Sequence, residues 1–183
     1  MKLILFILVT TTFLFSSNLS TLYRFYEKQA YIKACDYGHK YLYKNKNHKN
    51  EKYLTLYGLS CLETNKIDRI SVPMISLKKS KDARANASYF STILLQKQFL
   101  FQALIDKKPL ANLEVPRTNF IVSKIFFLFL EKKFTVKDGI YKFNDEVKKD
   151  TRYQLYIKES EESEIYMIID IYKDDKFIQR YKY

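Results

Sequence analysis

Residues 31–62 read YIKACDYGHKYLYKNKNHKNEKYLTLYGLSCL and decide how the N-terminal part of the chain is organised. Small and apolar residues recur at intervals of three and four on both sides of a break, which is the spacing of one helix face. These residues are Tyr31, Ala34, Cys35, Gly38 and Leu42 before the break, and Leu54, Tyr57, Gly58, Cys61 and Leu62 after it. The break, residues 44–49, contains only Lys, Asn and His and is typical of a loop. The stretch therefore predicts two helices, residues 31–43 and one from about residue 50, each with one cysteine.

Helical periodicity continues outward from this pair. A short helix is predicted before it, from Ser20 to Lys28, and another after it, from Ile67 to Lys79. The strongest helical pattern runs from Ser80 to Ile105, with Ser80 or Asp82 as the candidate N-cap. A last helix begins at Thr118 and is apolar nearly all round, which favours a buried central position.

The pattern changes after Lys133, where β-branched and aromatic residues begin to alternate with polar ones. Short polar turns separate the runs, which are Gly139–Phe143, Arg152–Lys158, Glu164–Tyr172 and Lys176–Tyr183. Period-two runs of this kind predict an antiparallel meander of about four strands with one covered face. We expect this sheet to pack on the Thr118 helix, because so few strands bury little by themselves. The predicted fold class is α+β, with a helical domain at residues 18–133 and the meander at residues 134–183.

Residues 1–17 have the order of a secretory signal peptide. Lys2 supplies a positive start, an apolar run extends from Leu3 to Phe15, and the small residues Ser16 and Ser17 follow. We predict cleavage after Ser16 or Ser17 and export to the periplasm. The alternative is an uncleaved inner-membrane anchor at residues 3–17, although a spanning helix needs about 20 apolar residues.

The charge balance is strongly basic, with 32 Lys and Arg against 20 Asp and Glu and a formal net charge of +12. Such a balance is common in nucleic-acid-binding proteins. Export argues against nucleic acid and indicates anionic membrane surfaces or acidic proteins as partners. Compositional drift is the alternative source of the charge, because residues with AT-rich codons are abundant, with 16 Tyr and 14 Phe against no Trp.

Residues that carry catalysis or hold metals are scarce. The two histidines, His39 and His48, lie beside or within the polar break and are predicted to be solvated. Neither fits a nucleophilic or zinc-binding pattern, and three glycines leave no phosphate-binding loop. The glutamates of residues 159–164 are explained better by a solvated turn than by catalytic carboxylates or a calcium site. We predict no catalytic residue, metal or cofactor, and a protein that is not an enzyme.

Tyrosines crowd the first predicted helices. Tyrosine supplies contact area at low entropic cost and is enriched in binding surfaces. The candidate interaction surface consists of Tyr23, Tyr26, Tyr37, Tyr41 and Tyr43. Packing is the alternative role, since a chain without Trp uses Tyr and Phe in its core, and we assign packing to Tyr31.

A resemblance follows from the residues quoted first. The spacing Tyr31-x-x-Ala34-x-x-x-Gly38 resembles the second helix of a tetratricopeptide or Sel1-type repeat. The spacing Leu54-x-x-Tyr57-Gly58-x-x-Cys61 resembles the first helix of the next repeat, with a period of about 36 residues against about 34 in the family. An ordinary α-hairpin bundle is the alternative. The whole chain also resembles small exported proteins of unknown function from epsilonproteobacteria, which implies an envelope location.

The repeat resemblance implies a disulfide between Cys35 and Cys61. A tetratricopeptide-like arrangement packs together the two helices that carry them, with the cysteines on the facing sides. Helix axes about 8–10 Å apart allow a disulfide at a close crossing, and an exported chain meets an oxidising compartment. Two buried free thiols are the alternative.

Together these patterns favour a non-catalytic periplasmic interaction module. The helical-repeat resemblance implies binding of a partner protein, as a scaffold or adaptor in an envelope assembly such as a flagellar-motor or secretion accessory. A second hypothesis is a basic protein that binds an anionic envelope polymer or lipid surface. A third is an enzyme with an unrecognised site.

Overall fold

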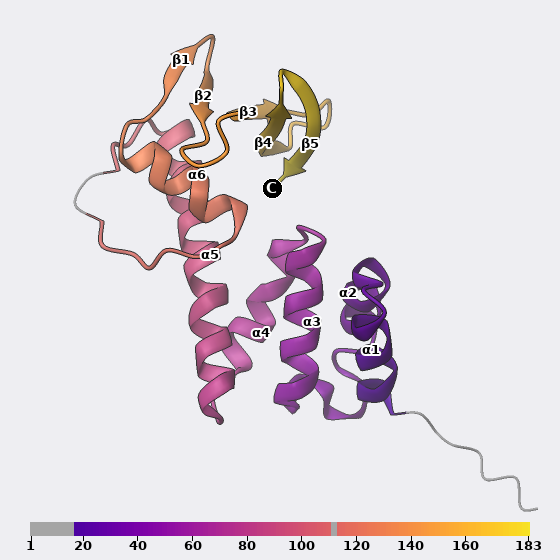
Figure 1. Ribbon diagram of the computed structural model, residues 1–183. Coiled ribbons are helices and arrows are strands. Elements are labelled where there is room, and N and C mark those ends of the chain that lie inside the picture. Colours follow the sequence, from indigo (N-terminus) through magenta and orange to yellow (C-terminus); the bar gives the residue numbers. More distant parts are fainter. Residues whose placement is uncertain (1–16, 111–112) are drawn as a thin grey trace, which may run out of the picture.

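The computed structural model describes residues 17–110 and 113–183. The predicted signal peptide, and the alternative anchor at residues 3–17, lie outside the described part except for Ser17. The described chain folds as a helical body followed by an antiparallel sheet (Figure 1), which confirms the predicted α+β class. No helix within these two ranges has both the length and the apolar character that crossing a bilayer requires.

The helices all precede the strands in the described part of the chain. The helices and 3₁₀-helices are α1 (Asn18–Glu27), α2 (Tyr31–Lys40), η1 (Lys44–Lys49), α3 (Glu51–Glu63), η2 (Ile67–Ile70), α4 (Ser71–Ser76), α5 (Lys81–Ile105) and α6 (Ile121–Leu130). The strands are β1 (Thr135–Lys137), β2 (Ile140–Asn144), β3 (Thr151–Glu159), β4 (Ile165–Lys173) and β5 (Lys176–Lys182). Neighbouring strands pair antiparallel in the order β1-β2-β3-β4-β5, so the sheet is a simple meander.

Side-chain caps set the starts of the helices that organise the body. Ser80 accepts a hydrogen bond from the backbone N–H of Ala83, as its position before α5 predicted. Asn50 caps α3 in the same way through the N–H of Tyr53. The next residue, Glu51, accepts hydrogen bonds from the backbone N–H groups of residues 78–80. This contact holds the α4–α5 connection against α3.

The prediction of one continuous helix from Ile67 to Lys79 is wrong. It divides into the 3₁₀-helix η2 and the short α4, and α4 ends at Ser76. Leu77 leaves the helical region at ψ 99°, with its side chain buried. The backbone N–H groups that follow Leu77 donate to the Glu51 carboxylate, so a tertiary contact replaces the last helical turn.

Close approach of helices at two glycines shapes the core of the body. α3 packs against α2 on one side and against α4 and α5 on the other (Figure 1). A Cβ built at Gly38 would lie 2.5 Å from Cδ2 of Tyr57, and one built at Gly58 would lie 2.6 Å from two ring atoms of Phe90. Both rings are buried, at 1% and 0% exposure. The small residues in the quoted stretch therefore let these aromatic rings fill the space between helices.

Gly58→Ala is expected to destabilise the protein by about 1–2 kcal/mol. An added methyl gains about 1 kcal/mol of helix propensity. Forcing it into this core costs about 2–3 kcal/mol, the upper part of the usual range, because it would meet two ring atoms of Phe90 at 2.6 Å and Cβ of Pro73 at 3.3 Å. Urea unfolding of the variant and of the wild type measures the difference. Ser88→Ala, at an exposed position of α5, is the matched control and should change the stability by less than about 0.5 kcal/mol. An unchanged midpoint for Gly58→Ala would contradict the packing.

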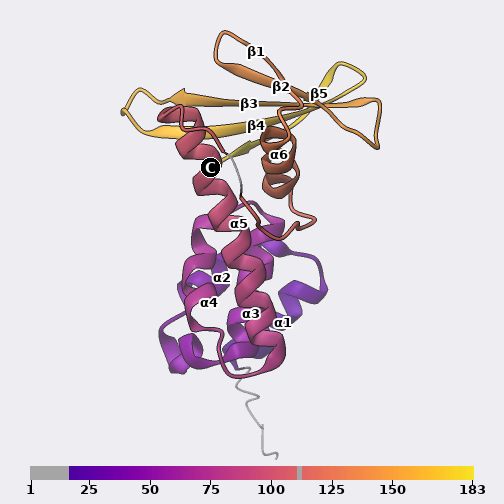
Figure 2. The same ribbon diagram turned by 90° about the vertical axis from the view of Figure 1, so that its left-hand side faces the viewer.

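The sheet lies across the end of the helical body, and α5 reaches from the body to the sheet (Figure 2). Its inner face packs on α5 and α6 and carries Phe143, Tyr153, Leu155, Met167 and Ile169, all within the common core. The prediction that the sheet covers the last helix is confirmed. α6 starts at Ile121 rather than Thr118, because Phe120 is extended at φ −75° and ψ 148°. The backbone N–H of Thr118, before it, donates to Oγ of Ser123.

A buried carboxylate fastens the β2–β3 turn to α6. Asp145 is 3% exposed and accepts hydrogen bonds from Nζ of Lys124 at 2.7 Å and from the Tyr153 hydroxyl. The backbone N–H groups of Val147 and Lys148 donate to its other oxygen at 2.9 and 3.0 Å. Burial pushes the pKa of Asp145 upward, but these four donors outweigh it and hold the pKa well below the ordinary value.

Candidate functional site

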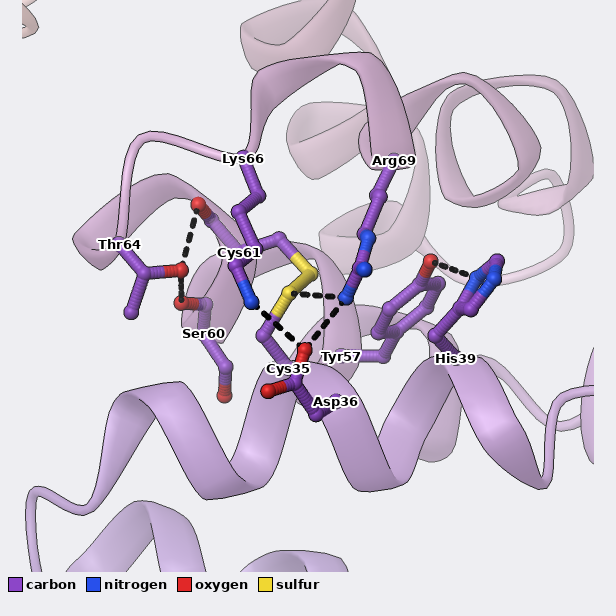
Figure 3. Close-up of polar contacts among 9 residues, drawn as sticks. All are labelled: Cys35, Asp36, His39, Tyr57, Ser60, Cys61, Thr64, Lys66 and Arg69. Atoms are coloured by element: carbon purple, nitrogen blue, oxygen red, sulfur yellow. Dashed lines mark hydrogen bonds and ion pairs between the residues drawn. A yellow bond between two sulfur atoms is a disulfide. The ribbon is translucent and has the colours of Figure 1, made fainter. Parts of the chain in front are cut away.

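The predicted disulfide is present and joins α2 to α3. Cys35 and Cys61 are bonded, with their Cα atoms 4.8 Å apart, and both residues are 0% exposed. Figure 3 shows Arg69 and Lys66 of the following turn reaching over the disulfide toward Asp36. Because neither sulfur is accessible, no solvent thiol can attack the disulfide in the folded state. The disulfide is therefore a structural cross-link within the helical body.

Asp36 forms ion pairs with two basic residues beside the disulfide. Its Oδ1 accepts hydrogen bonds from Nζ of Lys66 at 2.6 Å and from Nη1 of Arg69 at 2.7 Å. These hydrogen bonds lower the pKa of Asp36. Nη1 of Arg69 also lies 3.7 Å from Sγ of Cys35. The cluster ties η2 to α2 at the surface, where ion pairs contribute little stability.

The two histidines differ in their surroundings. His39 is exposed, and its Nδ1 lies 3.2 Å from the hydroxyl of Tyr57 (Figure 3). Burial raises the pKa of Tyr57 to about 12, so the phenol stays protonated near neutral pH. His48 is half-buried against the ring of Tyr43, and its Nδ1 has no hydrogen-bond partner within the described part. Among the described residues, no group of three or more His, Cys, Asp or Glu is placed to hold a metal ion.

The five tyrosines of the candidate surface fall into separate environments. The rings of Tyr37 and Tyr41 pack against each other at a tilt of 37°, with centroids 4.4 Å apart. The Nζ atoms of Lys40 and Lys44 lie 5.5 and 5.1 Å from the centroid of the Tyr41 ring. Tyr26 packs edge-on against Tyr31. Tyr23 and Tyr43 are the exposed members, at 50% and 72%. Tyr37 and Tyr41 are thus the two that the structure brings together.

A second surface, which the sequence patterns did not single out, is the outer face of the sheet. The helices pack on the opposite face (Figure 2), and cross-strand partners project from the outer face in rows. One row crosses all five strands and is Thr135, Lys142, Gln154, Asp170 and Arg180. The next row is Asn144, Arg152, Tyr172 and Phe177. We refer to these rows with their neighbours Tyr156, Tyr166 and Lys182 as the outer face.

The side chains of the outer face are held in place by one another. Asp170 is 1% exposed and pairs with Arg180 through two hydrogen bonds of 2.7 and 2.8 Å. The Tyr156 hydroxyl donates to the same carboxylate at 3.0 Å. Nζ of Lys182 lies 3.4 Å from the centroid of the Tyr166 ring. The aromatic and cationic groups are therefore ordered before any partner arrives.

One end of the outer face is hollowed and strongly cationic. A hollow of about 500 Å³ is lined by parts of both rows and by the segment that leads into β1. Its charged residues are Lys132, Lys133, Lys142 and Arg152, and no carboxylate lines it. We call it the basic hollow. The other lining residues are Thr135, Asn144, Gln154 and Tyr172, together with Phe134, Phe143 and Tyr153, which belong to the core side of the sheet.

The signal for the outer face was present in the sequence. The polar positions of the strand runs alternate as regularly as the apolar ones, and in β3 they read Arg152, Gln154, Tyr156 and Lys158. The acidic residues 159–164 form the exposed β3–β4 turn at the other end of the sheet. Comparison of the chain with protein-family models, with curated proteins and with solved structures finds no match in any of the three.

Proposed function

We propose that this protein is a non-catalytic interaction module of the cell envelope, which binds a partner protein through the outer face of its sheet. The observation that carries the proposal is an ordered array of tyrosines, lysines and arginines on a sheet face that no described helix covers. Tyrosine and arginine are enriched where proteins bind one another. Side chains that are already fixed lose little entropy on binding.

Two observations support a periplasmic location for the module. The disulfide between Cys35 and Cys61 is of a kind that persists in oxidising compartments. The first 17 residues have the order of a signal peptide. A chain with a long helical body at one end and a free sheet face at the other suits a scaffold or adaptor in an envelope assembly. The body itself remains a proposed relative of tetratricopeptide repeats.

Photocrosslinking in cells that express the chain tests the proposal and locates the binding surface. A photoreactive amino acid replaces Tyr172 or Phe177 on the outer face, Tyr23 or Tyr43 on the helical surface, or the exposed Ile75 as control. We expect the two outer-face positions to give one and the same adduct, identified by mass spectrometry, and Ile75 to give none. Adducts confined to Tyr23 and Tyr43 would move the binding surface to the first helices. No adduct from any position would refute the interaction module.

The formal net charge of +12 and the basic hollow favour a second candidate, a protein that binds an anionic envelope polymer or lipid surface. Binding of that kind depends on the total charge more than on position and weakens steeply with salt. It predicts that charge reversals anywhere on the surface weaken binding to anionic vesicles by similar factors.

A further inference from the structure

We infer that the basic hollow is a docking site for an extended acidic segment of the partner protein. The inference rests on the proposed function and adds the chemistry of the partner. It commits to carboxylate side chains on a polypeptide, because the hollow combines uncompensated positive charge with amide and hydroxyl groups at the spacing of an extended chain. Each of these features is set by named residues.

The positive charge of the hollow is not neutralised from within. Lys132 and Lys142 are exposed and have no ion-pair partner in the described part of the chain. Lys133 pairs with Glu131 and Glu146, and Arg152 with Asp175, but these carboxylates lie outside the lining and are partly or largely exposed. Lys132 and Lys142 therefore add uncompensated charge beside a concave volume, where it attracts anions more strongly than on a convex surface.

The spacing of the lining side chains matches an extended polypeptide. Lys142 and Asn144 lie two residues apart on β2, as do Arg152 and Gln154 on the neighbouring β3. Two residues of a strand span about 6.6 Å, which is also the distance between alternate side chains of an extended ligand. Lys142 and Arg152 are diagonal neighbours across β2 and β3, about 7–8 Å apart. A segment with acidic residues at every second position therefore brings successive carboxylates near both.

The uncharged groups suit the backbone of such a segment. Asn144 and Gln154 each carry a donor and an acceptor, as a peptide unit does. The hydroxyls of Thr135 and Tyr172 stand beside them. A flat lipid surface would meet the lysines of the hollow but has no peptide units to pair with the amides of Asn144 and Gln154. The lining thus favours a polypeptide over a membrane surface.

Binding of a defined peptide by the purified full chain tests the inference. The probe is a fluorescein-labelled eight-residue peptide of alternating Glu and Ser, with a Gln and Ser peptide as its neutral counterpart. The double variant Lys132→Glu, Lys142→Glu changes the hollow. The control is Lys33→Glu, Lys52→Glu, which makes the same charge change at exposed helical positions. Fluorescence anisotropy gives the affinities, and circular dichroism establishes that each variant is folded.

We expect the wild type to bind the acidic peptide at least tenfold more tightly than the neutral one. The hollow variant should lose at least tenfold in affinity and the control less than twofold. Lys142→Gln, which keeps more of the charge, should give an intermediate loss and replaces the double variant if that variant does not fold. Equal losses in the hollow and control variants, or no loss in either, would overturn the inference.

Other anions separate the inference from the proposed function. Vesicles containing phosphatidylglycerol and the polymer dextran sulfate are offered to the same three proteins. If the hollow variant loses binding to either of these while the wild type ignores the acidic peptide, the occupant is not a polypeptide and the inference falls. The proposed function still stands in that case if the outer-face photocrosslinks form, because they do not depend on the charge of the partner.

Discussion

Removal of the disulfide between Cys35 and Cys61 is expected to lower the melting temperature by about 10 °C. The two cysteines are 26 residues apart in the sequence, and closing a loop of that length stabilises the folded state by about 3.5 kcal/mol in the chain-entropy model. For a chain of this size each kcal/mol corresponds to about 2–4 °C. The double variant Cys35→Ala, Cys61→Ala tests the value by calorimetry.

The reduced wild type separates the cross-link from the packing of the sulfurs. Reduced protein keeps both side chains in the core and loses only the bond, so it isolates the contribution of loop closure. The double alanine variant should melt at or slightly below the reduced wild type, because it also leaves small cavities. Because Cys35 and Cys61 are bonded to each other, alkylation of the oxidised protein should modify neither of them, even in denaturant. Equal melting temperatures for the oxidised protein and for protein that was reduced in denaturant and then refolded would contradict the prediction, as would two thiols in freshly isolated protein.

The helices of residues 31–62 were predictable because helical spacing is a local signal. Small residues on the apolar face of a helix also indicate that another helix packs closely there. Helical spacing placed Cys35 and Cys61 on apolar faces, and both positions are buried and bonded to each other. Gly38 and Gly58 lie where Tyr57 and Phe90 fill the inter-helix space. The polar break was harder to predict, since it forms the 3₁₀-helix η1 with Asn45 and Lys46 at positive φ.

The sheet shows where local patterns stop being informative. β1 spans Thr135–Lys137 and is wholly exposed, so it carries no apolar alternation and was not predicted. Antiparallel pairing with β2 holds β1 in its extended conformation. The alternation of apolar residues predicted a sheet with one covered face, and the sheet packs on α5 and α6 through that face. The outer face requires the register of five strands, because Thr135 and Arg180 join one row only after every pairing between them is known.

The tyrosine surface could not be resolved from the sequence for a similar reason. Tyrosine satisfies both a core and a surface position, and only the tertiary contacts decide between them. Tyr53 and Tyr57 of α3 are buried, whereas Tyr43 is 72% exposed although it lies in an equally aromatic stretch. The hydroxyl of Tyr53 donates to the backbone carbonyl of Gly38 at 3.0 Å, and this contact between helices makes its burial possible.

Asp145→Ala is expected to destabilise the protein by about 3 kcal/mol, an effect close in size to the loss of the disulfide. The change removes the acceptor of four donors and leaves the buried hydroxyl of Tyr153 without an acceptor for its proton. An unsatisfied buried group costs about 1–3 kcal/mol, and charged hydrogen bonds contribute more than neutral ones. Lys124 is partly exposed and can be rehydrated, which keeps the cost below that of a fully buried ion pair.

The same carboxylate predicts a pH dependence. Its folded-state pKa lies below the ordinary value of 3.8, so it stabilises the folded state at neutral pH. That stability is present above the unfolded pKa and is lost as pH falls through the folded pKa. The difference in unfolding free energy between pH 7 and pH 3 should therefore shrink in Asp145→Asn, which cannot ionise. Tyr153 acts at the other end of the scale, because burial and the Asp145 hydrogen bond raise its pKa and its contribution is lost only at high pH.

Urea unfolding at pH 7 and pH 3 compares the contribution of the buried Asp145 carboxylate with that of an ordinary surface charge. Glu146, the next residue, pairs with Lys133 at the surface and is the matched control. Glu146→Gln should change the unfolding free energy by less than about 0.5 kcal/mol, as exposed ion pairs do. If Asp145→Ala costs no more than this control, the hydrogen bonds of Asp145 do not fasten the β2–β3 turn to α6.

Since that turn directly follows Asn144 of the basic hollow, peptide binding by Asp145→Asn should weaken along with its stability, while Glu146→Gln should bind as the wild type does.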